Sequence, residues 1–143
     1  MTLENPLDDT SVRVLGALME KEVTTPDNYP LTLNALTAAC NQASNRDPVM
    51  SLEEGDVSRA LQELDARGFA RAVHRSDSRV RRYRQAITEK LSLHQPEAAA
   101  MCVLMLRGPQ TTGEIRTRAA RMFEFIDLAH VEITLQGLMT LSA

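Results

Sequence analysis

The periodicity of the apolar residues changes at Phe69, and this change constrains the fold more than any other feature of the sequence. Before it, three segments carry apolar residues at helical spacing, over residues 8–23, 31–42 and 51–68. After it, "FARAVHR" and "RVRRYR" flank a short "SDS" turn and alternate, imperfectly, as the strands of a β-hairpin do. Three helices followed by a hairpin is the element order of a winged helix, whose second and third helices form a helix-turn-helix.

Residues that favour helix ends support these boundaries. Thr32 is placed to cap the second helix. Ser51 and Glu54 have the spacing of a capping box at the start of the third helix. Gly68 suits the left-handed position that follows the end of a helix. The local sequence therefore predicts three separate helices before the hairpin.

The same order of helix signals recurs after a short bridge. Pro96 favours a first helical turn, and Gly108, which a proline follows, is suited to end that helix. Thr111 and Glu114 form a second capping box. Asp127 can cap a third helix. The order of these signals predicts three further helices.

The two third helices align without a gap over their cores. The first reads V-S-R-A-L-Q-E-L over residues 57–64, and the second reads V-E-I-T-L-Q-G-L over residues 131–138. Their matching places in the helix order favour a duplicated unit. We therefore predict a mainly α fold with a small β-hairpin, built from tandem winged-helix units at residues 1–85 and 96–143 with a bridge at residues 86–95. The second unit lacks its wing, which favours a shortened form of a longer protein.

Arginine is concentrated in the predicted hairpin. Residues 67–84 hold seven arginines and one aspartate, a formal charge of +6 in a chain whose net charge is −3. An arginine-rich wing can follow the phosphate backbone of double-stranded DNA or enter its minor groove. The candidate DNA-binding residues are Arg71, Arg75, Arg79, Arg81, Arg82 and Arg84 in the hairpin, with Ser58, Arg59 and Gln62 on the third helix.

Two observations keep other interpretations open. Charges on an edge hairpin also prevent aggregation, a role that requires no ligand. The start of the third helix carries Glu53, Glu54 and Asp56, and acids close to phosphates weaken DNA binding. The leading hypothesis is a regulatory DNA-binding protein that uses its basic wing. The alternative is a scaffold that binds a protein partner.

The segment "CNQASNRDPVM" separates the second and third helices with more polar side chains than a turn requires. Its residues of interest are Asn41, Gln42, Ser44, Asn45, Arg46, Asp47 and Pro48. In a structural interpretation, Asn45 and Asp47 fold onto nearby backbone amides. Arg46 then pairs with Glu20 or Glu22 at the end of the first helix. In a functional interpretation, Ser44, Asn45 and Arg46 hold a phosphate or an acidic partner. We favour the structural interpretation.

The segments "TTPDNYPL", "LNALT" and "NQASNRDPV" occur close together in the first half of the chain. With them the sequence resembles the YceH-like family of uncharacterised bacterial proteins. Looser similarity continues through "VSRALQELDARG" and "GEIRTRAARMFEF" and so covers nearly the whole chain. The resemblance implies a tandem winged-helix architecture and does not imply a function. Members of that family look longer, with a basic hairpin after the last helix.

The remaining composition disfavours several functions. Three Phe, two Tyr and no Trp are few for a protein that stacks nucleic-acid bases. No glycine-rich phosphate loop, metal-ligand spacing or nucleophile motif occurs, so we expect no enzymatic activity, catalytic residue, metal or cofactor. No apolar stretch approaches a membrane span, and no signal peptide is seen. We expect a cytoplasmic protein away from membranes, with buried thiols at Cys40 and Cys102; its oligomeric state stays open.

Overall fold

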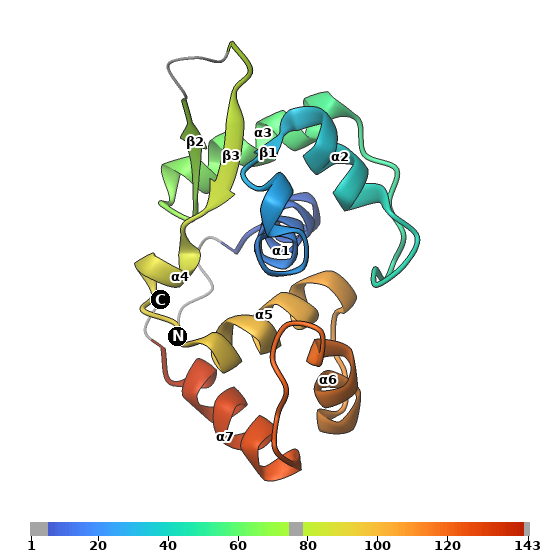
Figure 1. Ribbon diagram of the computed structural model, residues 1–143, viewed down its shortest axis with the longest axis vertical. Coiled ribbons are helices and arrows are strands. Elements are labelled where there is room, and N and C mark those ends of the chain that lie inside the picture. The colour runs from blue at the N-terminus through green and yellow to red at the C-terminus, as the bar shows by residue number, and fades with distance from the viewer. Residues whose placement is uncertain (1–5, 75–78, 142–143) are drawn as a thin grey trace.

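The fold is mainly helical, with one small antiparallel sheet. The computed structural model describes residues 6–74 and 79–141, and these contain seven α-helices, a short 3-10 helix and three strands (Figure 1). In chain order the elements are α1 (Asp9–Thr24), η1 (Pro26–Asn28), β1 (Leu31–Thr32), α2 (Leu33–Asn41), α3 (Glu54–Ala66), β2 (Ala70–Val73), β3 (Arg82–Gln85), α4 (Ile87–Lys90), α5 (Gln95–Arg107), α6 (Thr112–Ala119) and α7 (Leu128–Met139). This architecture is consistent with a winged-helix-like fold, as the element order predicted.

The predicted hairpin is present, and a third strand joins it. β2 and β3 are antiparallel neighbours, with Val73 opposite Arg82. β1 lies on the other side of β3, where Leu31 pairs with Tyr83, so the strand order is β1–β3–β2. Two residues are too few to show a strand period in the sequence, which is why β1 was not predicted. The predicted turn at residues 76–78 lies outside the described residues.

The capping box predicted at Ser51 and Glu54 is wrong, because a residue of α2 holds the chain there. Asn41 binds both backbone groups of Leu52: its Oδ1 accepts from the amide N–H at 2.7 Å, and its Nδ2 donates to the carbonyl oxygen at 2.8 Å. The helix therefore begins at Glu54, and the N–H of its N-cap residue donates to the Asp56 carboxylate at 2.9 Å. The contact between Asn41 at the end of α2 and Leu52 before α3 therefore explains why α3 starts later than the sequence predicted.

The other helix-end signals are confirmed. The side chains of Thr32, Thr111 and Asp127 accept hydrogen bonds from the first amides of α2, α6 and α7. Gly68 and Gly108 follow α3 and α5 with φ angles of +78° and +74°. Each signal acts within one helical turn, so it does not depend on the rest of the fold. The segment predicted as a bridge between the two units contains the short helix α4. The interpretation of α5–α7 as a duplicate of the first unit stays a prediction.

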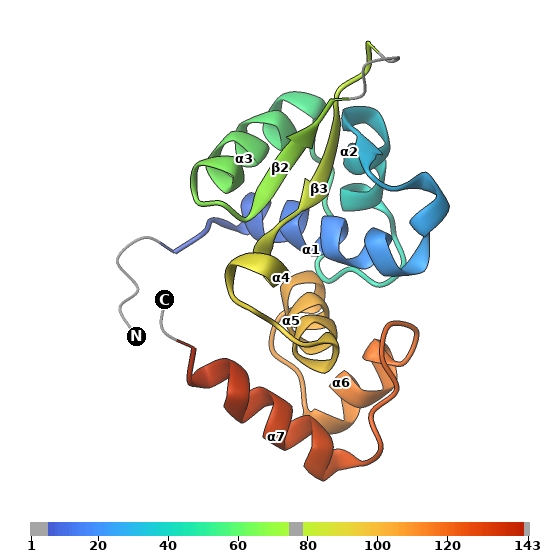
Figure 2. The same cartoon turned by 60° about the vertical axis from the view of Figure 1, so that its left-hand side comes forward.

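Helix α1 is central, with elements of both halves packed around it. Figures 1 and 2 show α2, α3 and the sheet on one side of α1 and α5 on the other. All residues from Arg13 to Glu20 are buried. A Cβ atom added at Gly16 would lie 2.9 Å from Cδ2 of Leu106, and the Cys102 thiol donates to the Gly16 carbonyl oxygen at 3.4 Å. The absence of a side chain at Gly16 lets the two helices approach closely, so the two halves form one packed body.

Both cysteines are free and buried, as predicted. Burial raises the pKa of the Cys40 thiol and that of the Cys102 thiol to about 12. A thiol becomes a good nucleophile or metal ligand only when it ionises, so these two side chains serve as small apolar groups of the core.

We predict that Gly16→Ala destabilises the protein by about 1–3 kcal/mol, the usual cost of overpacking a core. The added methyl group has to displace Leu106, which is itself buried, or Met105. Gly55 in α3 is the matched control, because a Cβ there would meet only the Arg59 guanidinium at 3.6 Å. Gly55→Ala should be neutral or stabilising by up to about 1 kcal/mol through helix propensity. Urea denaturation measures both variants, and a Gly16→Ala protein as stable as the wild type would contradict the close approach.

Candidate functional site

The hairpin projects from the end of the molecule opposite α7 (Figure 1). Arg79 and Arg81 directly precede β3 and are exposed, and within the described part of the chain neither has an ion-pair or hydrogen-bond partner. Arg71 on β2 is exposed as well and pairs with Asp65 of α3, with 3.1 Å between Nη1 and Oδ1. Arg75 lies outside the described residues. The described hairpin therefore offers two unpaired guanidinium groups to a partner.

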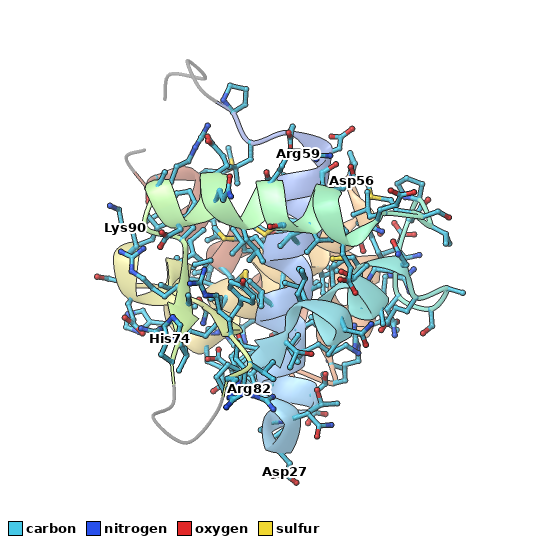
Figure 3. The ribbon with its side chains drawn as sticks, turned by 90° about the horizontal axis from the view of Figure 1, so that it is seen from above. Asp27, Asp56, Arg59, His74, Arg82 and Lys90 are labelled. Atoms are coloured by element: carbon cyan, nitrogen blue, oxygen red, sulfur yellow. The ribbon has the colours of Figure 1, made fainter. Side chains whose placement is uncertain are left out.

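The next two arginines of the hairpin are tied to acceptors within the protein. Nη1 of Arg82 donates to the carbonyl oxygen of Pro30 at 3.2 Å. Nη1 of Arg84 lies 3.0 Å from the Glu89 carboxylate on α4. Figure 3 shows Arg82 next to the segment that joins α1 to α2. The structure thus separates these two arginines from Arg79 and Arg81.

A shallow hollow of about 110 Å³ lies between α3 and the hairpin. It brings together four of the predicted DNA-binding residues, two from α3 and two from the hairpin: Ser58, Gln62, Arg71 and Arg81. Arg59 does not line this hollow. Its guanidinium pairs with Asp56 on the side of α3 that faces away from the hairpin (Figure 3). The hollow is therefore the place where the two predicted groups of residues meet.

Two buried arginines hold the loop between α2 and α3. Arg13 of α1 donates to the carbonyl oxygens of Cys40, at 3.0 Å, and Pro48, at 2.5 Å. Nε of Arg46 donates to the carbonyl oxygen of Ala39 at 3.1 Å. The last carbonyl groups of a helix have no partner within it, so these arginines satisfy the end of α2. The role of Arg13 was not predicted, although an arginine inside an apolar helical stripe is a signal of a buried cation.

Arg46 also pairs with Glu20, as predicted. Its Nη1 and Nη2 donate to Oε2 and Oε1 of Glu20 at 2.9 and 2.7 Å, and neither side chain has any exposed surface. Arg121, between α6 and α7, donates to the same carboxylate. Burial alone raises the pKa of Glu20, but hydrogen bonds and charge from the two arginines outweigh burial and lower that pKa to about 2. The ionised carboxylate therefore joins α1, the loop and the second half of the chain.

Further side-chain and backbone groups of the loop also form hydrogen bonds within the protein. Nε2 of Gln42 donates to the carbonyl oxygen of Ser44 at 2.9 Å. Asn45, with a φ of +59°, accepts from the Arg107 guanidinium of α5 at 3.2 Å. The N–H of Asp47 donates to a carbonyl oxygen at the end of α5 at 3.0 Å. Asn45 and Asp47 were expected to bind backbone amides of the loop itself, and they bind α5 instead. These contacts support the structural interpretation of this segment.

The described residues contain no group of three or more His, Cys, Asp or Glu side chains placed to hold a metal ion. None of the described helices is long and apolar enough to cross a lipid bilayer. The chemistry that the surface offers at the hairpin is that of cationic groups and hydrogen-bond donors.

We predict that Arg46→Ala destabilises the protein by about 3–5 kcal/mol, because it leaves a buried carboxylate short of a partner. Arg59→Ala is the matched control: it removes the same side chain and another ion pair, but 73% of the Arg59 side chain is exposed. An exposed pair contributes less than about 1 kcal/mol. Thermal and urea denaturation compare the two variants. Equal, small losses would show that the loop is not held by this pair.

The comparisons with known proteins identify relatives along nearly the whole chain. The sequence matches the family described as "Protein of unknown function, DUF480" over residues 7–143. It is 57% identical over 132 residues to a UPF0502 protein of Solibacter usitatus, which is 92% of this chain and 64% of that protein. It is 55% identical over 137 residues to a UPF0502 protein of Geobacter metallireducens, which is 96% of this chain and 62% of that protein.

This chain spans less than two thirds of the length of these curated relatives. The matches agree with the resemblance to an uncharacterised bacterial family. The matching family and proteins carry the names DUF480 and UPF0502, and the name YceH-like is not among them. With matching residues from the start of α1 to the end of α7, the chain belongs to the DUF480 family of proteins of unknown function.

Proposed function

We propose that the protein binds double-stranded DNA through its hairpin, as a non-enzymatic regulatory protein of the bacterial cytoplasm. The observation that carries the proposal is the placement of Arg79 and Arg81, which are exposed and have no ionic partner among the described residues. Guanidinium groups form strong, often bidentate hydrogen bonds with phosphate oxygens. An arginine without an internal acid breaks no ion pair when it binds a phosphate.

The hollow beside α3 supports the same proposal and limits its scope. Ser58 and Gln62 lie beside Arg81 there and carry groups that hydrogen-bond phosphates or base edges. The exposed residues at the start of α3 include Glu53 and Glu54, whose charges repel phosphates. We therefore propose that the hairpin supplies most of the affinity and that the protein discriminates weakly between DNA sequences.

In the same proposal, α5–α7 form a second winged-helix unit. Three helices in the expected order support it, with the capping residues of α6 and α7 in their predicted places. The gap-free match between residues 57–64 and 131–138 supports it as well, since the two segments lie in α3 and α7.

A protein-binding scaffold is the second candidate, because carboxylates neutralise the arginines at both ends of α3. Arg59 pairs with Asp56, and Arg67 pairs with Glu63 at 2.8 Å. A surface of balanced charge suits contact with a protein better than contact with a polyanion.

The test is a titration of random-sequence duplex DNA at several salt concentrations. Replacing Arg79 and Arg81 together by alanine should weaken binding and change the slope of log K against log salt by about 1.8, since each phosphate contact contributes roughly 0.9. The matched control replaces Lys90 and Arg118, two basic residues outside the hairpin, and should leave the slope near that of the wild type. An unchanged slope in the folded hairpin variant would exclude hairpin-led binding. No retardation of DNA at low salt would favour the scaffold.

A further inference from the structure

A groove lies on the other side of the hairpin from the hollow beside α3. It has a volume of about 630 Å³ and runs between the end of α1, η1 and α2. Arg81 and Tyr83 line the hollow, whereas Arg82 lines the groove. Neighbouring residues in an extended chain point to opposite faces, so this alternation follows from the strand geometry. The groove is therefore separate from the surface proposed to bind DNA.

Segments that carry the family resemblance line the groove. "TTPDNYPL" contributes Thr25, Asn28 and Tyr29, and Gln42 comes from "NQASNRDPV". The DNA-binding proposal uses neither segment. The groove is thus a surface that these segments build and that the proposed function leaves unexplained.

The groove carries an excess of positive charge. Lys21 and Arg82 line it, and Arg82 is bound to the carbonyl oxygen of Pro30, which does not cancel its charge. The ammonium group of Lys21 lies 3.4 Å from Glu20, but that carboxylate already holds two arginines. The lining also includes one carboxylate, that of Asp27 in η1. Two cations thus stand against one carboxylate in the described lining, and this excess of positive charge favours a negatively charged occupant.

The shape of the groove favours a narrow chain. Ala35 and Ala38 of α2 line it and are exposed, so a backbone can lie close to the helix. The amide side chains of Asn28 and Gln42 are suited to hydrogen-bond peptide groups. The aromatic residue of the lining, Tyr29, is half-buried, and its hydroxyl accepts from the Gln85 N–H at 2.7 Å. It is not free to act as a stacking platform for a nucleic-acid base.

We propose that this groove binds an extended, acidic segment of a partner protein, with Lys21 and Arg82 pairing with its carboxylates. Exposed alanines that allow a close backbone approach, together with side-chain amides that can bind peptide groups, suit the recognition of an extended peptide. The proposal rests on the groove alone and holds whether or not the hairpin binds DNA.

The experiment titrates the full chain with a fluorescein-labelled peptide of alternating glutamate and alanine and follows fluorescence anisotropy and backbone NMR shifts. The expected shifts map to Ala35, Ala38 and Gln42. Lys21→Gln with Arg82→Gln should weaken binding by about 2- to 30-fold, the loss expected when two partly exposed charge pairs disappear. Ala38→Phe should do the same by filling the groove, and because Ala38 is exposed this variant keeps the fold.

Two controls separate this site from the basic hairpin and from general anion binding. The variant that lacks Arg79 and Arg81 should bind the peptide with unchanged affinity, and a peptide of alternating glutamine and alanine should bind at least tenfold more weakly. Loss of binding in the hairpin variant would overturn the proposal. So would normal binding by Ala38→Phe, the same NMR shifts with inorganic phosphate alone, or no saturable binding at millimolar peptide.

Discussion

The buried carboxylate of Glu20 is the interaction on which the rest of the structure depends. It lies on α1, which packs against elements of both halves, and it accepts from Arg46 of the loop and Arg121 of the second half. A buried charge is costly unless it is paired and hydrogen-bonded. Each arginine therefore has one well-defined position, and the loop and the second half are placed relative to α1 by the same two oxygen atoms.

This arrangement explains why the loop between α2 and α3 is rich in polar residues. The loop ends one helix, starts another and contacts α5, so several backbone groups need partners that are not in a helix or a strand. Arg13 and Arg46 supply the partners for the end of α2, and Asn41 supplies them for the chain before α3. The loop in turn fixes α3 beside the hairpin, where the proposed DNA contacts are. The polar residues of the motif thus position a surface that is some distance from them.

Local signals in the sequence predicted much of the fold. Capping residues such as Thr32 and Thr111, and the glycine after α3, act through backbone groups within one turn and need no tertiary information.

The predicted start of α3, by contrast, was wrong, because the Asn41 side chain of α2 binds the backbone of Leu52 just before the helix. The pairing of Arg46 with an acid at the end of α1, Glu20 or Glu22, was predicted, and the structure shows that the partner is Glu20. The contribution of Arg121 was not, because the packing of the second half on α1 is not encoded in any local pattern. The alternation of Arg81 and Arg82 between the two faces of the hairpin follows from strand geometry, but the surface that each face meets required the structure.

The central claim is that Glu20 and its arginines make both halves one cooperative unit, and native-state hydrogen exchange tests it most directly. In increasing sub-denaturing urea, the slowest amides of α3 and of α5 should converge on a single opening free energy, equal to that of global unfolding. The slowest amides of α6 and α7 should also need this global free energy to open. The helices α5–α7 should therefore not form a group that opens at a lower free energy than α1–α3. If α5–α7 exchange as a separate unit while α1–α3 stay protected, the two halves unfold independently, and the account of a shared buried carboxylate is contradicted.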